Sequence, residues 1–102
     1  MGPIAARMAL ESIECIADVV AIEALLAAQG LDLRMQGRAW DPESREPTSA
    51  VPVKPAPSIG RAHEIMRSEI PFWEDDGVLH PALVSAGNIV RSGALLGEPQ
   101  PW

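Results

Sequence analysis

Residues 15–33, CIADVVAIEALLAAQGLDL, decide the fold of this chain because they form an apolar run that one helix cannot shield from water. Of these 19 residues, 14 are apolar, and two of the polar exceptions are Asp18 and Glu23. When the run is wound as a helix, Asp18 and Glu23 lie on different sides, so no wide polar face remains for solvent. Such a helix needs neighbours on most of its sides.

The same apolar pattern continues outward and predicts one helix from Pro3 to about Arg34. Pro3 suits a first helical turn, where its missing N–H costs nothing. Gly30 costs about 1 kcal/mol relative to alanine, so the helix can end there or continue to Arg34. We interpret residues 1–36 as a long bundle helix. Its expected interface consists of apolar residues at helical spacing: Ile13, Ile16, Val20, Ala24 and Ala27.

Glu14 and Asp18 are like charges one turn apart on this helix, which is mildly unfavourable unless a cation lies near both. Two interpretations follow from the sequence. The pair forms part of a solvated stripe, or it is a docking site for an Arg or Lys of a partner.

The overall composition limits the possible partners and the compartment. The net charge of −6 repels phosphate backbones and anionic lipid headgroups, so neither nucleic acid nor a membrane surface is an expected partner. A transmembrane span is disfavoured because each carboxylate in the central run would cost about 2.5–3.5 kcal/mol. The single cysteine excludes an internal disulfide, and no charged segment precedes an apolar run as in a signal peptide. These features favour the cytoplasm.

Residues 37–57 contain half of the ten prolines and form the expected Pro-rich linker. Proline cannot continue a helix or pair within a central strand, so this segment is predicted to be an extended surface loop. Trp40 is its one large apolar side chain in the first half and is expected to pin the loop to a neighbouring surface.

Residues 58–102 are predicted to form two short helices and a tail, which together with the long helix make one incomplete, all-α domain. The first short helix begins with Ser58 as its N-cap and ends near Ile70, before a proline, with Arg67 turned toward solvent. The second begins at Pro81 and ends near Ser92. Gly93 is expected in its C-terminal capping position, followed by a frayed tail from residue 97. We expect the whole to be part of a larger helical bundle.

The sequence offers no catalytic, cofactor-binding or metal-binding set. Cys15 is surrounded by Ile and Ala in the predicted helix and is interpreted as a small core residue rather than a nucleophile. His63 and His80 lack a second histidine at zinc-ligand spacing, and residues 74–76, EDD, lack the alternating ligands of a calcium loop. A solvated turn is the better interpretation of residues 74–76.

Several separated blocks of sequence resemble one known family. Residues 1–7, MGPIAAR, and 20–34, VAIEALLAAQGLDLR, are similar to the C-terminal region of the aromatic amino acid ammonia-lyases, the histidine and phenylalanine ammonia-lyase family. Three later blocks follow in the same order: GRAHE at 60–64, IPF at 70–72 with EDD at 74–76, and VRSG at 90–93. The resemblance covers nearly the whole chain apart from the Pro-rich linker.

The resemblance implies an activity whose machinery this sequence lacks. Enzymes of the family eliminate ammonia with a methylidene-imidazolone group formed from an internal Ala-Ser-Gly, and a tyrosine acts as base. This sequence has SAG at 85–87 and RSG at 91–93, but no Ala-Ser-Gly and no tyrosine. No cofactor is therefore expected in this chain, and the methylidene-imidazolone group is expected only in the missing family portion.

The resemblance also implies a structural role, because in the family this region contributes a long helix to a bundle shared among the subunits of a tetramer. The chain is accordingly expected to be a C-terminal structural part or small subunit of an ammonia-lyase-like protein, either separately encoded or truncated, and inactive alone. A larger ammonia-lyase-like chain would be its partner through the first helix, acting on an aromatic amino acid such as histidine or phenylalanine. The alternative is a non-catalytic helical protein that self-associates through the same helix.

Overall fold

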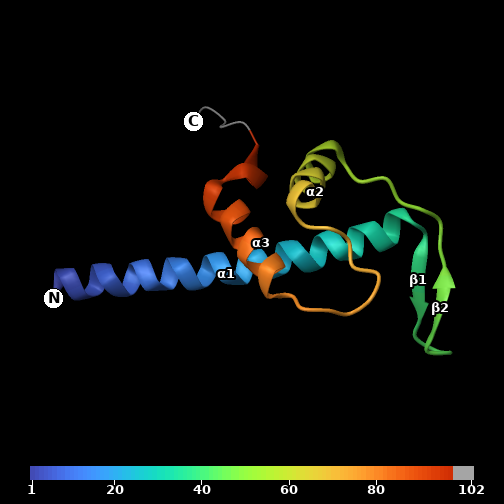
Figure 1. Ribbon diagram of the computed structural model, residues 1–102, viewed down its shortest axis with the longest axis horizontal. Coiled ribbons are helices and arrows are strands. Elements are labelled where there is room, and N and C mark those ends of the chain that lie inside the picture. The colour runs from blue at the N-terminus through green and yellow to red at the C-terminus, as the bar shows by residue number, and fades with distance from the viewer. Residues whose placement is uncertain (98–102) are drawn as a thin grey trace.

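The first helix, α1 (Gly2–Met35), is the longest element of the computed structural model, which describes residues 1–97 (Figure 1). The helix continues through Gly30 and ends at Met35, close to Arg34, the later of the two predicted ends. No atom outside the helix lies within 4 Å of where a side chain at Gly30 would begin. The helix ends where Gly37 adopts a left-handed conformation with φ 71°.

A β-hairpin follows α1, and the prediction of a wholly extended loop over residues 37–57 is wrong for its first half. Strands β1 (Arg38–Asp41) and β2 (Glu46–Ser49) pair antiparallel, with Trp40 opposite Pro47. A proline is compatible with this hairpin because each of two paired strands has a free edge. The carboxylate of Asp41 accepts hydrogen bonds from Glu43 N (2.9 Å) and Ser44 Oγ (2.8 Å), which stabilises the turn.

Two short helices complete the described chain. The first, α2 (Pro57–Glu69), has Ala56 as its N-cap and so begins two residues before the predicted helix. The prediction of Ser58 as N-cap is therefore wrong, because Pro57, with its fixed φ, takes the first helical turn. The second, α3 (His80–Ser92), ends as predicted at Gly93, whose φ is 76°. A 3-10 turn, η1 (Ala94–Leu96), follows, and residues 98–102 of the predicted frayed tail lie outside the described part.

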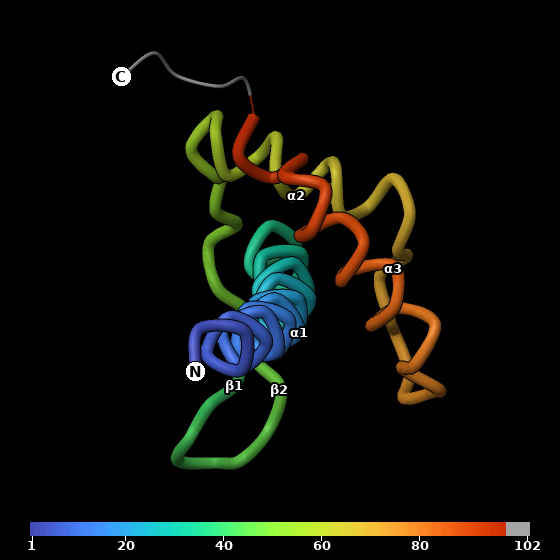
Figure 2. Tube along the Cα trace, turned by 90° about the vertical axis from the view of Figure 1, so that its left-hand side faces the viewer, coloured from blue at the N-terminus to red at the C-terminus, as the bar shows by residue number. Residues whose placement is uncertain are grey.

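The hydrophobic core lies on one side of the second half of α1. Figure 2 views α1 nearly end-on, with α2 and α3 on this side and the hairpin on another. The buried residues are Ala21, Leu25 and Ala28 of α1, Met66 and Ile70 at α2, and Ala86 and Ile89 of α3. The fold is mostly helical, as predicted, and the two short helices cover only part of the long one.

Candidate functional site

The first half of α1 is an apolar helix surface that no other element of the described chain covers. Every residue from 1 to 16 is exposed, although this segment contains several large apolar side chains. We call the following set the open face of α1: Ile4, Met8, Leu10, Ile13 and Ile16, each between 59% and 65% exposed. In Figure 1, this half of α1 projects away from α2 and the hairpin. An apolar surface of this kind is typical of a protein interaction site.

The five predicted interface residues do not share one environment. Ile13 and Ile16 belong to the open face, and Val20 and Ala27 are also exposed. Ala24 instead is half-buried and packs against the hydrophobic core. The position of Ala24 is explained by α2 and α3, which cover one side of α1 and leave the others to solvent. Whether the exposed residues bind another polypeptide stays a prediction.

Cys15 is exposed, so its interpretation as a core residue is wrong. Its isoleucine and alanine neighbours along the sequence lie on α1, but no short helix packs over its own side. The sequence pattern identified apolar surroundings correctly and could not show that they remain uncovered.

Arg91 of α3 lies across the two like charges of α1. Its guanidinium donates to Glu14 Oε2 (2.9 Å) and to Asp18 Oδ1 (2.7 Å). These bonds to Asp18 and Glu14 hold the pKa of Arg91 above its ordinary value. The carboxylates therefore pair with a cation of their own chain and not with one of a partner, while their side chains remain 65% and 67% exposed to solvent. Gly87 permits this path, because a Cβ there would lie 2.6 Å from Arg91 Nη1.

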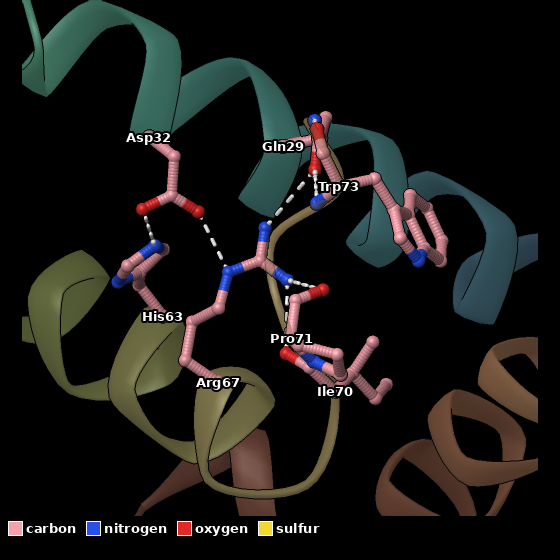
Figure 3. Close-up of polar contacts among 7 residues, drawn as sticks. All are labelled: Gln29, Asp32, His63, Arg67, Ile70, Pro71 and Trp73. Carbon is pink, nitrogen blue, oxygen red and sulfur yellow. Dashed lines mark hydrogen bonds and ion pairs between the residues drawn. The ribbon is translucent and has the colours of Figure 1, made fainter. Parts of the chain in front are cut away.

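A second polar cluster joins the C-terminal half of α1 to α2 and the loop after it (Figure 3). Asp32 is its centre. One oxygen of Asp32 accepts from Arg67 Nε at 2.6 Å, and the other lies 3.0 Å from His63 Nε2. All three side chains are mostly buried, with 12–15% of their surface exposed. The prediction that Arg67 points to solvent is therefore wrong.

The rest of the Arg67 guanidinium binds the chain after α2. Its Nη1 donates to the carbonyl oxygens of Ile70 (3.0 Å) and Pro71 (3.2 Å). Gln29 adds a bridge from α1, donating to the Trp73 carbonyl at 2.6 Å and accepting from Trp73 N at 3.3 Å. The backbone groups of this loop have no helical hydrogen-bond partners once α2 has ended, and the side chains of Arg67 and Gln29 supply partners for them.

The cluster holds α1, α2 and the loop after α2 together, and we call it the Asp32 clamp. Its geometry is not that of a reactive centre. Although partial burial tends to raise the pKa of Asp32, the contacts from His63 and Arg67 lower it more, so the carboxyl group remains ionised at neutral pH, with one oxygen hydrogen-bonded to Arg67 and the other facing His63. A general base needs an oxygen free to take a substrate proton. Sequence reasoning missed this site. The available signal was the spacing: Gln29 and Asp32 are one turn apart in the apolar run, as are His63 and Arg67 on α2.

Acid should weaken this clamp. Because the pKa of Asp32 is lowered in the folded chain, its stabilising contribution is present above the ordinary carboxyl pKa and is lost as the pH falls through the folded value. We expect the urea midpoint to fall as the pH is lowered from about 5 to about 3. The variant Asp32→Asn should show a flatter pH profile than the wild type. Profiles of equal slope would contradict this assignment.

Neither a membrane span nor a metal cluster is found in residues 1–97. No helix there is both long and apolar enough to cross a bilayer. Within the same residues, no three His, Cys, Asp or Glu side chains are grouped as metal ligands. His80 is exposed, and Asp76 accepts a hydrogen bond from Gly77 N (2.8 Å).

Comparison with curated proteins supports the resemblance seen in the sequence. Histidine ammonia-lyase from Sorangium cellulosum (strain So ce56) is 30% identical over 96 residues, which are 94% of this chain. Histidine ammonia-lyases from Anaeromyxobacter sp. (strain K) and Desulfotalea psychrophila are each 32% identical, over 93% and 92% of this chain. No family model and no solved structure matches it.

The matched segment is a small part of each relative. The chain covers 16% of the Sorangium and Anaeromyxobacter proteins and 15% of the Desulfotalea protein. These relatives are therefore much longer ammonia-lyase chains. Their similarity extends over α1, the hairpin and both short helices, because more than nine-tenths of this chain is aligned. The chain belongs to the histidine ammonia-lyase family, of which it represents one region.

Proposed function

We propose that this chain is a non-catalytic structural region of an ammonia-lyase-like protein and that α1 binds a larger ammonia-lyase-like chain. The main observation that supports this proposal is the exposure of the open face of α1. Five large apolar side chains in the first half of the helix are exposed, whereas the second half is anchored by the hydrophobic core and by the contacts of Asp32 with α2. A helix fixed at one end and apolar at the other can enter a bundle of further helices.

The larger portion would supply the chemistry. The names of the relatives suggest histidine as the substrate, and another aromatic amino acid is the broader possibility. The residues of this chain do not fit the family's electrophilic group, because it contains no Ala-Ser-Gly and no tyrosine. In the described part, the mostly buried carboxylate of Asp32 accepts a hydrogen bond from Arg67 and lies 3.0 Å from His63 Nε2. We place the complex in the cytoplasm.

Reconstitution tests this proposal. The purified chain is mixed with the remaining lyase portion that contains Ala-Ser-Gly, and the mixture is analysed by size-exclusion chromatography and by ammonia release from histidine. We expect one co-eluting complex, activity that depends on both components, and no activity from this chain alone. Absence of a complex and of any gain in activity would contradict the proposal.

Self-association is the second candidate, because a second copy could cover the same five apolar side chains of the open face. Sedimentation equilibrium of the isolated chain distinguishes the two. A stable homo-oligomer that the larger lyase portion does not dissociate favours self-assembly, whereas a monomer that is captured by the lyase portion favours the heteromeric complex.

A further inference from the structure

The β-hairpin at the C-terminal end of α1 has two outer edges, and the direction of its backbone groups follows from one hydrogen bond (Figure 1). Ala50 N donates to Gly37 O at 2.8 Å, just beyond the paired residues of the two strands. In an antiparallel ladder, hydrogen-bonded and non-hydrogen-bonded pairs alternate. The pair of Trp40 with Pro47 is therefore non-hydrogen-bonded, as is the pair that contains Arg38. The N–H and C=O groups of these pairs point away from the hairpin.

The two edges differ in their ability to bind a further strand. Pro47 faces outward on β2 and has no N–H, so the edge of β2 lacks a donor at that position. The edge of β1 is complete, with an outward N–H and an outward C=O at both Arg38 and Trp40. Among residues 1–97, neither the loops nor the side chains supply a hydrogen bond to these four groups. An unpaired edge of this kind is a template for another strand.

We propose that β1 pairs antiparallel with β1 of a second copy of this chain, giving a four-stranded sheet with its two-fold axis at Ala39. Hydrogen-bonded pairs across the axis join residues whose groups point outward on both strands. Arg38 of each copy therefore lies opposite Trp40 of the other. The two Ala39 residues form the closely spaced pair at the centre, where Cα atoms are about 4.5 Å apart and a small side chain fits.

The side chains of β1 are complementary to themselves in this register. Arg38 and Trp40 are exposed on one face of the strand, whereas Ala39 and Asp41 are half-buried on the other. Trp40 is 61% exposed, and a guanidinium placed over an indole ring makes a favourable cation–π contact. The two-fold axis creates this contact twice. We therefore assign the edge to a second copy rather than to a strand of the lyase portion.

The existing ion pair of Arg38 is compatible with this contact. Glu74 Oε1 accepts from Arg38 Nη1 at 2.9 Å, which uses the N–H groups in the plane of the guanidinium. An indole ring would instead pack on the flat face of the same group. Both partners can therefore bind Arg38 at the same time.

Backbone amide exchange of the full-length chain, measured by NMR over a dilution series, tests this proposal. The chain carries Ile13→Lys and Ile16→Lys, so that the open face of α1 does not add to self-association. We expect the amides of Arg38 and Trp40 to become protected as the concentration rises. The amide of Ser49 points outward at the other edge, on β2, and is the internal reference that should not change.

Proline substitutions at the two edges give the matched comparison. Trp40→Pro removes an outward N–H and the indole without removing a hydrogen bond between β1 and β2, so it should abolish dimerisation. Ser49→Pro removes the equivalent N–H of β2 and should leave the dimer intact. Trp40→Val keeps the N–H and should weaken the dimer about tenfold, because two cation–π contacts are lost. The amide of Thr48, which is bonded within the hairpin, reports in each variant whether the hairpin is intact.

Three results would overturn the proposal. The first is exchange at Arg38 and Trp40 that does not depend on concentration. The second is an equal loss of dimer in Ser49→Pro and Trp40→Pro while the Thr48 amide stays protected. The third is protection of the β1 edge only after the lyase portion is added, which would assign the edge to a strand of that portion. Because reconstitution reports on the open face of α1 and these amides report on the hairpin, the two proposals can fail separately.

Discussion

Replacing Arg67 with alanine should lower the free energy of unfolding by about 3 kcal/mol, the lower end of what the loss of one partner from a buried ion pair costs. The substitution removes the 2.6 Å hydrogen bond to the carboxylate of Asp32, a side chain that is only 13% exposed. It also removes the donors to the Ile70 and Pro71 carbonyls, which hold the loop after α2. Urea unfolding at neutral pH measures the change.

Arg38→Ala is the matched control for Arg67→Ala. Arg38 also pairs with a carboxylate, Glu74 Oε1 at 2.9 Å, but the two side chains are 47% and 66% exposed. Surface pairs of this kind contribute about 0–1 kcal/mol. We therefore expect Arg38→Ala to change stability much less than Arg67→Ala does. Equal effects of the two substitutions would show that burial does not give the Asp32 clamp its strength.

The double substitution Ile13→Lys with Ile16→Lys should abolish binding to the larger lyase portion while leaving the isolated chain folded. Each isoleucine contributes about 1.5–3 kcal/mol when it is fully buried. The loss of both corresponds to at least a hundredfold weaker complex, since each 1.4 kcal/mol is a factor of ten. In the isolated chain, the two side chains are 59% and 61% exposed, and lysine is a good helix former, so folding should be nearly unaffected. A binding titration measures the affinity, and circular dichroism measures the helix content.

Val51→Lys with Val78→Lys provides the control for this double substitution. These valines are 83% and 82% exposed and lie outside α1, so the same change of charge is made away from the open face. We expect this control to bind the lyase portion as the wild type does. If both double variants bind equally well, the open face of α1 is not the interface.

Local patterns predicted the helices well. Pro81 and Gly93 bound α3 as expected, because first-turn proline and left-handed glycine act within a few residues of themselves. The hairpin was missed because its prolines argue against strands. That argument holds for a central strand, whereas Pro47 lies in a strand of a two-stranded hairpin, and the turn is stabilised by a carboxylate, Asp41.

The sequence by itself determined that α1 carries more apolar surface than two short helices can cover, and its resemblance to the ammonia-lyases was confirmed by comparison. Both depend on residue type and spacing along one segment. Only the tertiary structure decided which carboxylates of α1 form ion pairs with the other helices. Arg67 is 35 residues from Asp32, and Arg91 is 73 residues from Asp18. Such pairs form only when α2 and α3 pack on one side of α1, and the energy of that packing comes from non-directional apolar burial, which no local motif specifies.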